Sequence, residues 1–405
     1  MEIISRKYYS EKIDFWLGKE TVIILSGQRR VGKSFLIKDF IQRHSASNDA
    51  NIIYVDKEKR QFQFIENGNQ LGDYIEKRYE AKKHNYILID EVQEIEGWER
   101  PICSFRTEPS TDIIITGNNT KMLSSELSTY LCGRYHEILV QSLSYCEFLE
   151  FHNLSDSDQS LKAYLYYGGL PGLRLIGLEE EDHVWEYIKD VLYTIIQKDI
   201  IERHGIQNIP ILNDLIAYYA DKIGKMCSAI NISRYMKTNQ QEIALNEVMN
   251  YTTHCCKAHL TATVKRYEIH GRKIFEPIYK AYFCDTGILN LLAGTEREAN
   301  LENIIENIVY QHLIRMGHQV YVGELQIGNI YFVCTKPNNV KYIQVTNKTH
   351  DEETCHRDFE RLQSIKNNCQ KYVISSSPLL DTHNHDGIIH ISLHDFLKYG
   401  LQDRP

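Results

Sequence analysis

The stretch TVIILSGQRRVGKSFLIKDFI, residues 21–41, determines how the rest of the sequence is interpreted. Residues 22–25 form a short apolar run of strand length, and apolar residues recur at helical spacing from Phe35 onward. Between them, residues 27–34 match the pattern G-x-x-x-x-G-K-[ST]. A strand, a glycine-rich turn and a helix start form the setting in which backbone N–H groups surround phosphate oxygens. The sequence therefore predicts a phosphate-binding loop.

The residue types of this loop suit the chemistry of a nucleotide phosphate. Gly27 and Gly32 let the backbone turn its N–H groups inward. Lys33 is expected to reach the β- and γ-phosphates, and the hydroxyl of Ser34 is expected to hold Mg²⁺. The arginine pair at 29–30 either contacts phosphate or pairs with neighbouring acidic residues. The expected ATP-binding residues are Gly27, Gln28, Arg29, Arg30, Val31, Gly32, Lys33, Ser34 and Phe35.

Further apolar runs of strand length follow the loop, at residues 51–55, 86–89, 113–115 and 137–140. Because these strands alternate with helical patterns, the sequence predicts an α/β fold with a parallel sheet covered by helices on both faces. In such sheets, ligands bind at the carboxyl ends of the strands. The polar residues expected at that edge are Ser34, Asp90, Glu91 and Asn118.

An acidic pair follows the third expected strand. Asp90 and Glu91 come directly after the apolar run at 86–89, a pattern that places carboxylates beside a phosphate loop. We expect Asp90 to support Mg²⁺ from outside its direct ligand shell and Glu91 to polarise the attacking water. The alternative is an acidic strand end with no catalytic role.

Two more side chains are candidates for contact with the transferring phosphoryl group. Asn118 follows the fourth strand and is the expected γ-phosphate sensor, with Asn119 and Thr116 as alternatives. A solvated turn explains the same residues. Arg134 either stabilises charge on that group, within its own chain or across a subunit boundary, or is an ordinary surface arginine. The oligomeric state is therefore left open.

The composition is typical of a globular protein with several domains. A length of 405 residues predicts two to four domains, and a net charge of −8 argues against a globally basic nucleic-acid binder. No apolar run approaches membrane length, and the N-terminal segment lacks the apolar region of a signal peptide. Ten cysteines without C-x-x-C spacing indicate a reducing compartment. We therefore expect a cytoplasmic protein.

Three further regions follow the expected phosphate-binding domain of residues 1–142. Residues 143–205 have a helical pattern interrupted by a glycine turn. Residues 206–293 carry three expected helices and then two strands, an order that makes a winged helix plausible, and residues 294–405 form a smaller α/β domain. DNA contact by the winged helix is left open, because its expected reading helix at 242–257 has few basic residues. Four basic residues cluster in the expected wing: Lys265, Arg266, Arg272 and Lys273.

Several motifs together resemble those of a known family. The loop at 27–34 is similar to the G-x-R-R-V-G-K-[ST] loop of predicted bacterial and archaeal ATPases of the AAA+/STAND type. The resemblance extends from about residue 3 to the C-terminus, and it implies an AAA+-like ATPase core, a helical lid, a winged-helix module and a restriction-endonuclease-like domain. The other motifs that carry it are IDEVQ at 89–93, TGN at 116–118, GR at 133–134, SYCEFL at 144–149, GGLP at 168–171 and KAYFCDTG at 280–287.

The C-terminal region departs from the pattern that this resemblance implies. Related nuclease folds hold a catalytic metal with a helix Glu, a strand Asp and a following [DEQ]-x-K. Here the helix Glu corresponds to Glu306, but Asn329 and Tyr331 occupy the strand positions. Thr346 stands in the place of the lysine, after Gln344. Because tyrosine and asparagine cannot replace carboxylates around a hard cation, we expect a degenerate nuclease fold with a structural or recognition role.

These patterns are best explained by an Mg²⁺-dependent ATPase whose hydrolysis switches its lid and C-terminal domains between two arrangements. The expected ligands are ATP and Mg²⁺. One alternative is a nucleotide-gated adaptor for DNA or protein, in which hydrolysis is incidental. Another is an ATP-dependent nuclease, which Asn329 and Tyr331 disfavour. A small-molecule kinase would use the same loop but has no evident acceptor site.

Overall fold

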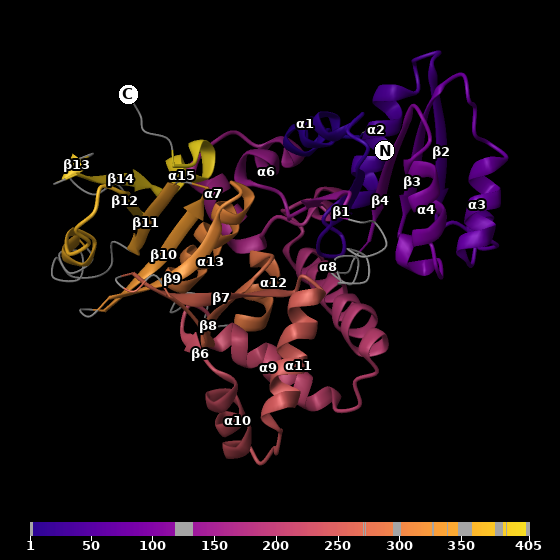
Figure 1. Ribbon diagram of the computed structural model, residues 1–405. Helices are drawn as coiled ribbons and strands as arrows, with labels where there is room; N and C mark the ends of the chain where they lie inside the picture. Colours follow the sequence, from indigo (N-terminus) through magenta and orange to yellow (C-terminus); the bar gives the residue numbers. More distant parts are fainter. Residues whose placement is uncertain are drawn as a thin grey trace. The chain divides into compact units, whose positions relative to one another are not determined.

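The computed structural model shows that the chain divides into two compact units (Figure 1). It describes residues 3–117, 133–269, 271, 273–294, 301–325, 328–337, 339–346, 359–376, 384–385 and 387–401. The first unit comprises Met1–Ser142 with the short segment Lys257–His259, and the second comprises Leu143–Cys256 and Leu260–Pro405. The expected domain boundaries at 142, 205 and 293 stay predictions.

A five-stranded parallel sheet forms the centre of the first unit, with the strand order β2-β3-β4-β1-β5. The strands are β1 Val22–Ser26, β2 Ala50–Asp56, β3 His84–Asp90, β4 Thr111–Thr116 and β5 Tyr135–Leu139. This sheet confirms the predicted α/β fold class. Strand β4 lies between β1, which leads into the phosphate loop, and β3, which ends at Asp90.

Helices cover both faces of this sheet because its strands are apolar on both sides. The helices are α1 Lys7–Trp16, α2 Lys33–His44, α3 Gly68–Glu76 and α4 Glu99–Arg106, with 3₁₀ turns at Arg60–Phe62 and Val92–Glu94. Successive side chains of a strand point to opposite faces. Accordingly, Val22 and Ile24 pack into one apolar cluster with α3 and α4, while Ile23 and Leu25 pack into another with α1 and α2.

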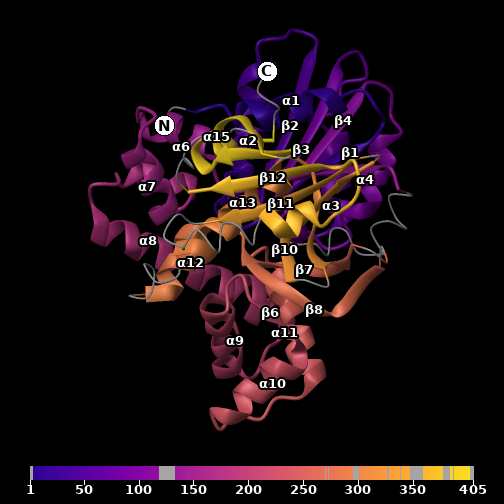
Figure 2. The ribbon, with the colours of Figure 1, turned by 90° about the vertical axis from the view of Figure 1, so that its left-hand side faces the viewer.

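The second unit combines a set of helices with a large mixed sheet (Figure 2). Its helices are α6 Tyr145–His152, α7 Asp158–Tyr167, α8 Glu181–Thr194, α9 Ile209–Asp221, α10 Ala229–Thr238, α11 Leu245–Lys257, α12 Thr286–Ala293, α13 Leu301–Arg315 and α15 Leu393–Tyr399. A 3₁₀ turn covers Pro171–Leu175, and α8 continues into a π-helix at Ile195–Glu202. Among the described residues of both units, no helix has the length and apolar character that a membrane span requires.

Nine strands form the sheet of the second unit, in the order β13-β14-β12-β11-β10-β9-β7-β8-β6. They are β6 Met226–Cys227, β7 Thr261–Glu268, β8 Lys273–Phe283, β9 Gln319–Leu325, β10 Gly328–Lys336, β11 Asn339–Thr346, β12 Gln370–Ser375, β13 Asn384–His385 and β14 Ile388–Ser392. Because β7 pairs in parallel with β9, the sheet continues across the expected boundary at 293. Arg266 Nη1 strengthens this junction by donating to Glu324 at 2.9 Å.

The glycine turn after α7 is joined to the start of α12 through one carboxylate. Asp285 caps α12 by accepting hydrogen bonds from the N–H groups of Gly287 and Ile288, at 2.9 and 3.2 Å. Its other oxygen accepts the N–H of Gly169 at 3.1 Å. A Cβ on Gly168 would lie 2.3 Å from the nitrogen of Gly287, so the two segments approach too closely for a larger residue. The two glycines of the GGLP motif therefore allow this turn to pack against the start of α12.

The SYCEFL motif starts helix α6 with a capping box. The hydroxyl of Ser144 accepts the N–H of Glu147 at 3.3 Å, and the Glu147 carboxylate accepts the N–H of Ser144 at 2.7 Å. Arg315, at the end of α13, donates to the same carboxylate at 2.9 Å. These residues therefore fix the start of α6 and tie it to α13.

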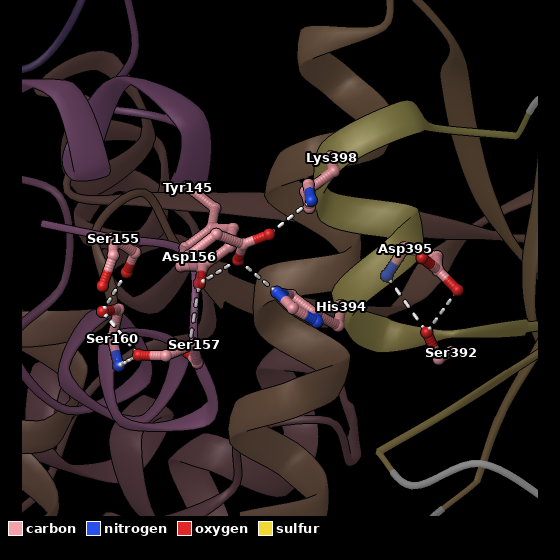
Figure 3. A network of polar contacts seen from close by, with 9 residues as sticks. All are labelled: Tyr145, Ser155, Asp156, Ser157, Ser160, Ser392, His394, Asp395 and Lys398. Atoms are coloured by element: carbon pink, nitrogen blue, oxygen red, sulfur yellow. Dashed lines mark hydrogen bonds and ion pairs between the residues drawn. The ribbon is translucent and has the colours of Figure 1, made fainter.

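A polar network joins the segment between α6 and α7 to the last helix, α15 (Figure 3). Asp156 accepts a hydrogen bond from the Tyr145 hydroxyl at 2.9 Å, and His394 Nε2 lies 2.5 Å from the same oxygen. Lys398 pairs with the other carboxylate oxygen. Because Lys398 donates to it, the pKa of Asp156 falls to about 2. Segments that are more than 200 residues apart in sequence are held together by this one carboxylate.

Candidate functional site

The predicted phosphate loop connects β1 to α2, as the sequence indicates. Gly27 has a φ of +142°, and a Cβ at this position would lie 2.1 Å from the carbonyl oxygen of Val140. Glycine is therefore required for the loop to pass this close to the end of β5. Gly32, with a φ of +99°, occupies the N-cap position of α2 in the left-handed region.

The start of α2 has the properties of an anion site. Gly32 has no side chain to cap the helix, and the N–H groups of the first turn carry the partial positive charge of the helix dipole. Leu36 N donates to the Gly32 carbonyl at 3.1 Å, so the α-helical hydrogen bonds begin at the N-cap. Helix N-termini of this kind bind phosphate groups through their backbone.

Lys33 is buried inside the loop, with 4% of its surface exposed. Its Nζ donates to the carbonyl oxygens of Gly27 and Gln28, each at 2.9 Å. Both acceptors are neutral, so these bonds orient the ammonium without neutralising it. The charge also acts on Glu91, where it lowers the carboxyl pKa against the effect of burial.

The predicted Mg²⁺ residues Ser34 and Asp90 lie next to each other. Burial raises the pKa of Asp90, while hydrogen bonds from Thr116 and Ser34 lower it. Thr116 Oγ1, at the end of β4, donates to Asp90 Oδ1 at 2.5 Å. The insertion of β4 between β1 and β3 therefore places a hydroxyl where it can orient this carboxylate.

Glu91 is the second carboxylate of the site and is 8% exposed. Its backbone is in the left-handed region, with φ +58°, and its N–H donates to Thr116 Oγ1 at 3.0 Å. Burial raises its carboxyl pKa, whereas Lys33, Gln93 and Arg29 lower it. Gln93 Nε2 donates to Glu91 Oε2 at 2.5 Å. Thr116, one of the weaker candidates from the sequence, therefore contacts the carboxylate of Asp90 and the main chain of Glu91.

Gln28 has a buried side chain, 2% exposed, whose two amide atoms have no hydrogen-bond partner within the described residues. An unpaired buried amide costs stability, so it marks a place where a further polar group is expected. Because Gln28 belongs to the phosphate loop, this observation agrees with its prediction as a ligand-binding residue.

The remaining loop residues differ in their exposure. Val31 is fully buried and Arg29 is half-buried, whereas Arg30 is exposed with a φ of +69°. Phe35 is 41% exposed, and Lys38 Nζ lies 4.8 Å from the centre of its ring. The charge of Arg29 lowers the pKa of the Glu91 carboxyl.

The structure does not bring Arg134 to this site within its own chain. Arg134 immediately precedes β5 and is exposed, and its carbonyl accepts the N–H of Val22 at the start of β1. The phosphate loop lies at the opposite end of β1, and strands rise about 3.3 Å per residue. Within its own chain, Arg134 therefore lies at the other end of β1 from the loop, and its role, within the chain or across a subunit boundary, stays a prediction. Asn118 and Asn119 lie outside the described residues.

Arg6, which the sequence patterns do not single out, contacts the main chain of the phosphate loop. Arg6 is buried at the start of α1, where its Nη1 donates to the Val31 carbonyl at 2.9 Å and its Nη2 to the Ser142 carbonyl at 3.3 Å. Its guanidinium lies 4.5 Å from the centre of the Tyr9 ring. Sequence patterns do not reveal such contacts because they join positions 25 and 136 residues apart.

The second unit contains a buried charge cluster of its own around Glu306. Glu306 is 1% exposed, and its carboxylate accepts hydrogen bonds from Lys280 Nζ at 2.6 Å and from the Tyr282 hydroxyl at 2.5 Å. The hydroxyl of Tyr331 donates to Glu302 at 2.8 Å, and Asn329 is exposed. The carboxylate expected to hold a nuclease metal is therefore engaged with side chains of β8.

The conserved-domain and sequence comparisons place these features among known proteins. Residues 19–149 match an AAA domain, and residues 158–299 match a domain of unknown function. An uncharacterized protein of Haemophilus influenzae is 30% identical over 404 residues, which cover 98% of each chain. An uncharacterized protein of Methanocaldococcus jannaschii is 24% identical, over 83% of this chain and 75% of its own length.

Among solved structures, the Walker-type ATPase of Pyrococcus abyssi is similar in fold, with a TM-score of 0.54. The alignment covers 72% of this chain and 96% of the Pyrococcus chain, at 16% identity, so the likeness shows the fold alone. It agrees with the parallel sheet and the phosphate loop of the first unit. The chain belongs to the family of the Haemophilus influenzae protein, and its first unit is a P-loop ATPase domain of the AAA+ type.

Proposed function

We propose that this chain is an Mg²⁺-dependent ATPase that uses ATP hydrolysis as a conformational switch. One observation carries the proposal: the carboxylates of Asp90 and Glu91 lie beside the same phosphate loop, where Ser34 contacts the first and Lys33 acts on the second. A phosphate cradle alone would support binding. A buried carboxylate next to it adds a group that can activate water.

The loop residues suit a nucleoside triphosphate. Gly27 allows an approach that a Cβ would block, α2 offers its N-terminal N–H groups, and Lys33 supplies a buried positive charge. We infer that the Ser34 hydroxyl would ligate Mg²⁺ directly and that Asp90 would hold the ion through its water shell. When bound, Mg²⁺ neutralises charge on the phosphate oxygens.

We assign Glu91 as the general base. Because burial raises its carboxyl pKa, it is a stronger base than an exposed glutamate. Its backbone is fixed by Thr116, so the carboxylate stays at the edge of the sheet where the phosphate loop lies. In this role it accepts a hydrogen bond from the attacking water and orients it toward the γ-phosphate.

Two substitutions test this assignment. Lys33→Ala is expected to weaken binding of a fluorescent ATP analogue by at least about 100-fold, because a charged donor to the phosphates is lost. Glu91→Gln is expected to bind the analogue normally but to lower kcat on the order of 10²- to 10⁴-fold. Phosphate release in the presence of Mg²⁺ measures the second effect.

Matched controls are available on the same elements. Lys38 lies on α2, five residues after Lys33, and Glu94 is exposed three residues after Glu91. Lys38→Ala and Glu94→Gln are expected to bind and hydrolyse ATP as the wild type does. Equal turnover by wild type and Glu91→Gln would refute the assigned base.

For the moving parts of the switch, we propose a lid at 143–205, a winged helix at 206–293 and a degenerate nuclease-like domain at 294–405. The order α9, β6, α10, α11, β7, β8, with β6 paired to β8, supports the winged helix. The engagement of Glu306 by Lys280 and Tyr282 supports a nuclease-like domain without metal chemistry. Metal-dependent cleavage of plasmid DNA that Glu306→Ala abolishes would contradict this view.

DNA contact is the second candidate function, and it is favoured by a local charge pattern. Residues 222–241 contain four lysines and arginines and no acidic residue, in a chain of net charge −8. Lys225, Arg234 and Lys237 are exposed there. Arg266 in the proposed wing is engaged by Glu324, so α10 is the better candidate surface.

The DNA candidate predicts a salt-dependent affinity. Duplex DNA binding by wild type is expected to weaken steeply between 50 and 200 mM salt, and Arg234→Glu with Lys237→Glu is expected to abolish it. Binding that requires ATP and persists in Glu91→Gln would favour the adaptor alternative, in which hydrolysis is incidental. Binding that ignores both charge reversals would exclude α10 as the contact surface.

A further inference from the structure

The backbone conformation at Glu91 places the side chain of Gln93, two residues later, next to the Glu91 carboxylate. Glu91 precedes the 3₁₀ turn Val92–Glu94 and has φ +58° and ψ +52°. Glu94 N donates to the Glu91 carbonyl at 3.1 Å and closes this turn. In consequence the Gln93 side chain faces Glu91, and its Nε2 donates to Oε2 of the carboxylate at 2.5 Å.

The main chain and the side chain of Glu91 are held by different partners. The N–H of Glu91 donates to Thr116 Oγ1 at 3.0 Å, which anchors the backbone to β4. Gln93 contacts the carboxylate itself. Catalytic groups need such supporting contacts, because a displacement of about 1 Å can lower a rate on the order of 100-fold.

Only one of the two polar atoms of the Gln93 amide has a hydrogen-bond partner among the described residues. Its Oε1 is buried and has no hydrogen-bond partner among the residues that the structure describes. A buried carbonyl oxygen without a partner destabilises the fold, so a leucine or methionine would fill this position at lower cost. The satisfied group of the amide is the Nε2 that is directed at Glu91.

We infer that Gln93 is a positioning residue for hydrolysis. By holding Oε2 of Glu91, it presents Oε1 to the attacking water. The inference rests on the proposed ATPase function, and it assigns Gln93 no contact with the nucleotide. Its effect is therefore expected on turnover and not on binding.

Gln93→Leu tests the inference because leucine fills a similar volume without a donor. We expect kcat for ATP to fall on the order of 10- to 100-fold, while KM and the affinity for a fluorescent ATP analogue with Mg²⁺ change less than about twofold. The thermal midpoint of the nucleotide-free protein is expected to stay within about 3 °C of wild type, because the unpaired Oε1 is removed together with the bond to Glu91. Gln63→Leu, at an exposed position of the same unit, is the matched control.

The outcomes separate this inference from the function on which it rests. If wild type turns over faster than Glu91→Gln and Gln93→Leu matches wild type, the positioning role is wrong and the ATPase function stands. A faster Gln93→Leu would also overturn the role, because Gln93 would then restrain the base. A lower thermal midpoint with kcat and KM unchanged would indicate a purely structural residue. Wild-type turnover no faster than that of Glu91→Gln would overturn the ATPase proposal itself.

Discussion

Two buried lysines, one in each unit, show how the same side chain serves either a ligand or the fold. Lys33 is 4% exposed and Lys280 is 7% exposed. Lys33 Nζ donates to two neutral carbonyls of its own loop, whereas Lys280 Nζ donates to the carboxylate of Glu306 at 2.6 Å. A carbonyl orients an ammonium and a carboxylate neutralises it. The two carbonyls leave the charge of Lys33 in place beside the Glu91 carboxylate at the loop, whereas the charge of Lys280 is paired directly with Glu306.

Both lysines belong to motifs of the sequence, at 27–34 and at 280–287. Membership of a motif therefore does not distinguish a ligand-binding lysine from a structural one. The distinction lies in the charge of the partner and in what the neighbouring polar groups do. Around Lys33, the amide of Gln28 has no partner within the described residues, whereas Glu306 is bonded to both Lys280 and Tyr282.

The largest expected effect is on the stability of the second unit. Lys280→Met leaves the buried carboxylate of Glu306 without its counter-charge, so we expect the free energy of unfolding to fall by about 3–5 kcal/mol. Because burial already raises the pKa of this carboxyl, some of the loss is relieved as Glu306 takes up a proton. Replacing both residues, as Lys280→Met with Glu306→Leu, is expected to recover most of the loss.

Urea unfolding followed by tryptophan fluorescence measures this effect in the second unit. Of the three tryptophans, only Trp185 lies in residues 143–405, so the variants are made in a Trp16→Phe, Trp98→Phe background. A double variant that is no more stable than Lys280→Met would show that the pair contributes more than its own charges.

The second expected effect is functional. Lys33→Met is expected to weaken ATP binding by at least about 100-fold, yet to lower the free energy of unfolding by less than Lys280→Met does, because the carbonyls of Gly27 and Gln28 carry no charge that would be left unpaired. Calorimetry with an ATP analogue measures the affinity, and urea unfolding of the same sample measures the free energy of unfolding. A stability loss as large as that of Lys280→Met would remove the contrast between the two lysines.

The third and smaller expected effect is on stability, and it concerns a glycine of the second unit that serves the fold and no ligand. Gly168 has φ +74° and ψ −160°, a region open almost only to glycine, and a Cβ there would meet Gly287 N at 2.3 Å. Gly168→Ala is expected to destabilise the second unit by about 1–3 kcal/mol. Gly205 also has a positive φ, +62°, but a Cβ added there would meet no atom within 4 Å. Gly205→Ala therefore introduces backbone strain without a steric clash and is the control. Equal losses in the two variants, by urea unfolding, would show that strain alone matters.

Much of the first unit follows from local sequence patterns, for reasons that the structure makes clear. The strands are continuous apolar runs because both faces are covered, and the loop between Gly27 and Ser34 is contiguous in sequence. The support of the site is not contiguous: Arg6 reaches Val31, and Thr116 reaches Asp90 and Glu91 from a neighbouring strand. Strand order decides such contacts, and periodicity does not predict strand order.

The second unit was harder to predict because its elements depend on long-range pairing. The expected wing and the C-terminal α/β region share one sheet through β7 and β9, which lie on opposite sides of the expected boundary at 293. The short strand β6 has two residues, too few to produce an alternation pattern. The altered nuclease positions were visible in the sequence, but the engagement of Glu306 by Lys280 and Tyr282 required the fold.

The smallest expected effect concerns an ion pair that is neither a ligand site nor buried. Asp156 has a pKa lowered to about 2, first because Lys398 donates to it. A lowered carboxyl pKa contributes stability above the unfolded value, near 3.9, and this contribution is lost as pH falls through the folded value. Lys398→Ala is therefore expected to lower the thermal midpoint by a few degrees at most at pH 7, with the difference shrinking as pH falls from about 5 to about 2. Thermal unfolding of both proteins across that range measures it. Equal thermal midpoints of the two proteins at every pH would mean that His394, not Lys398, is the partner that holds Asp156.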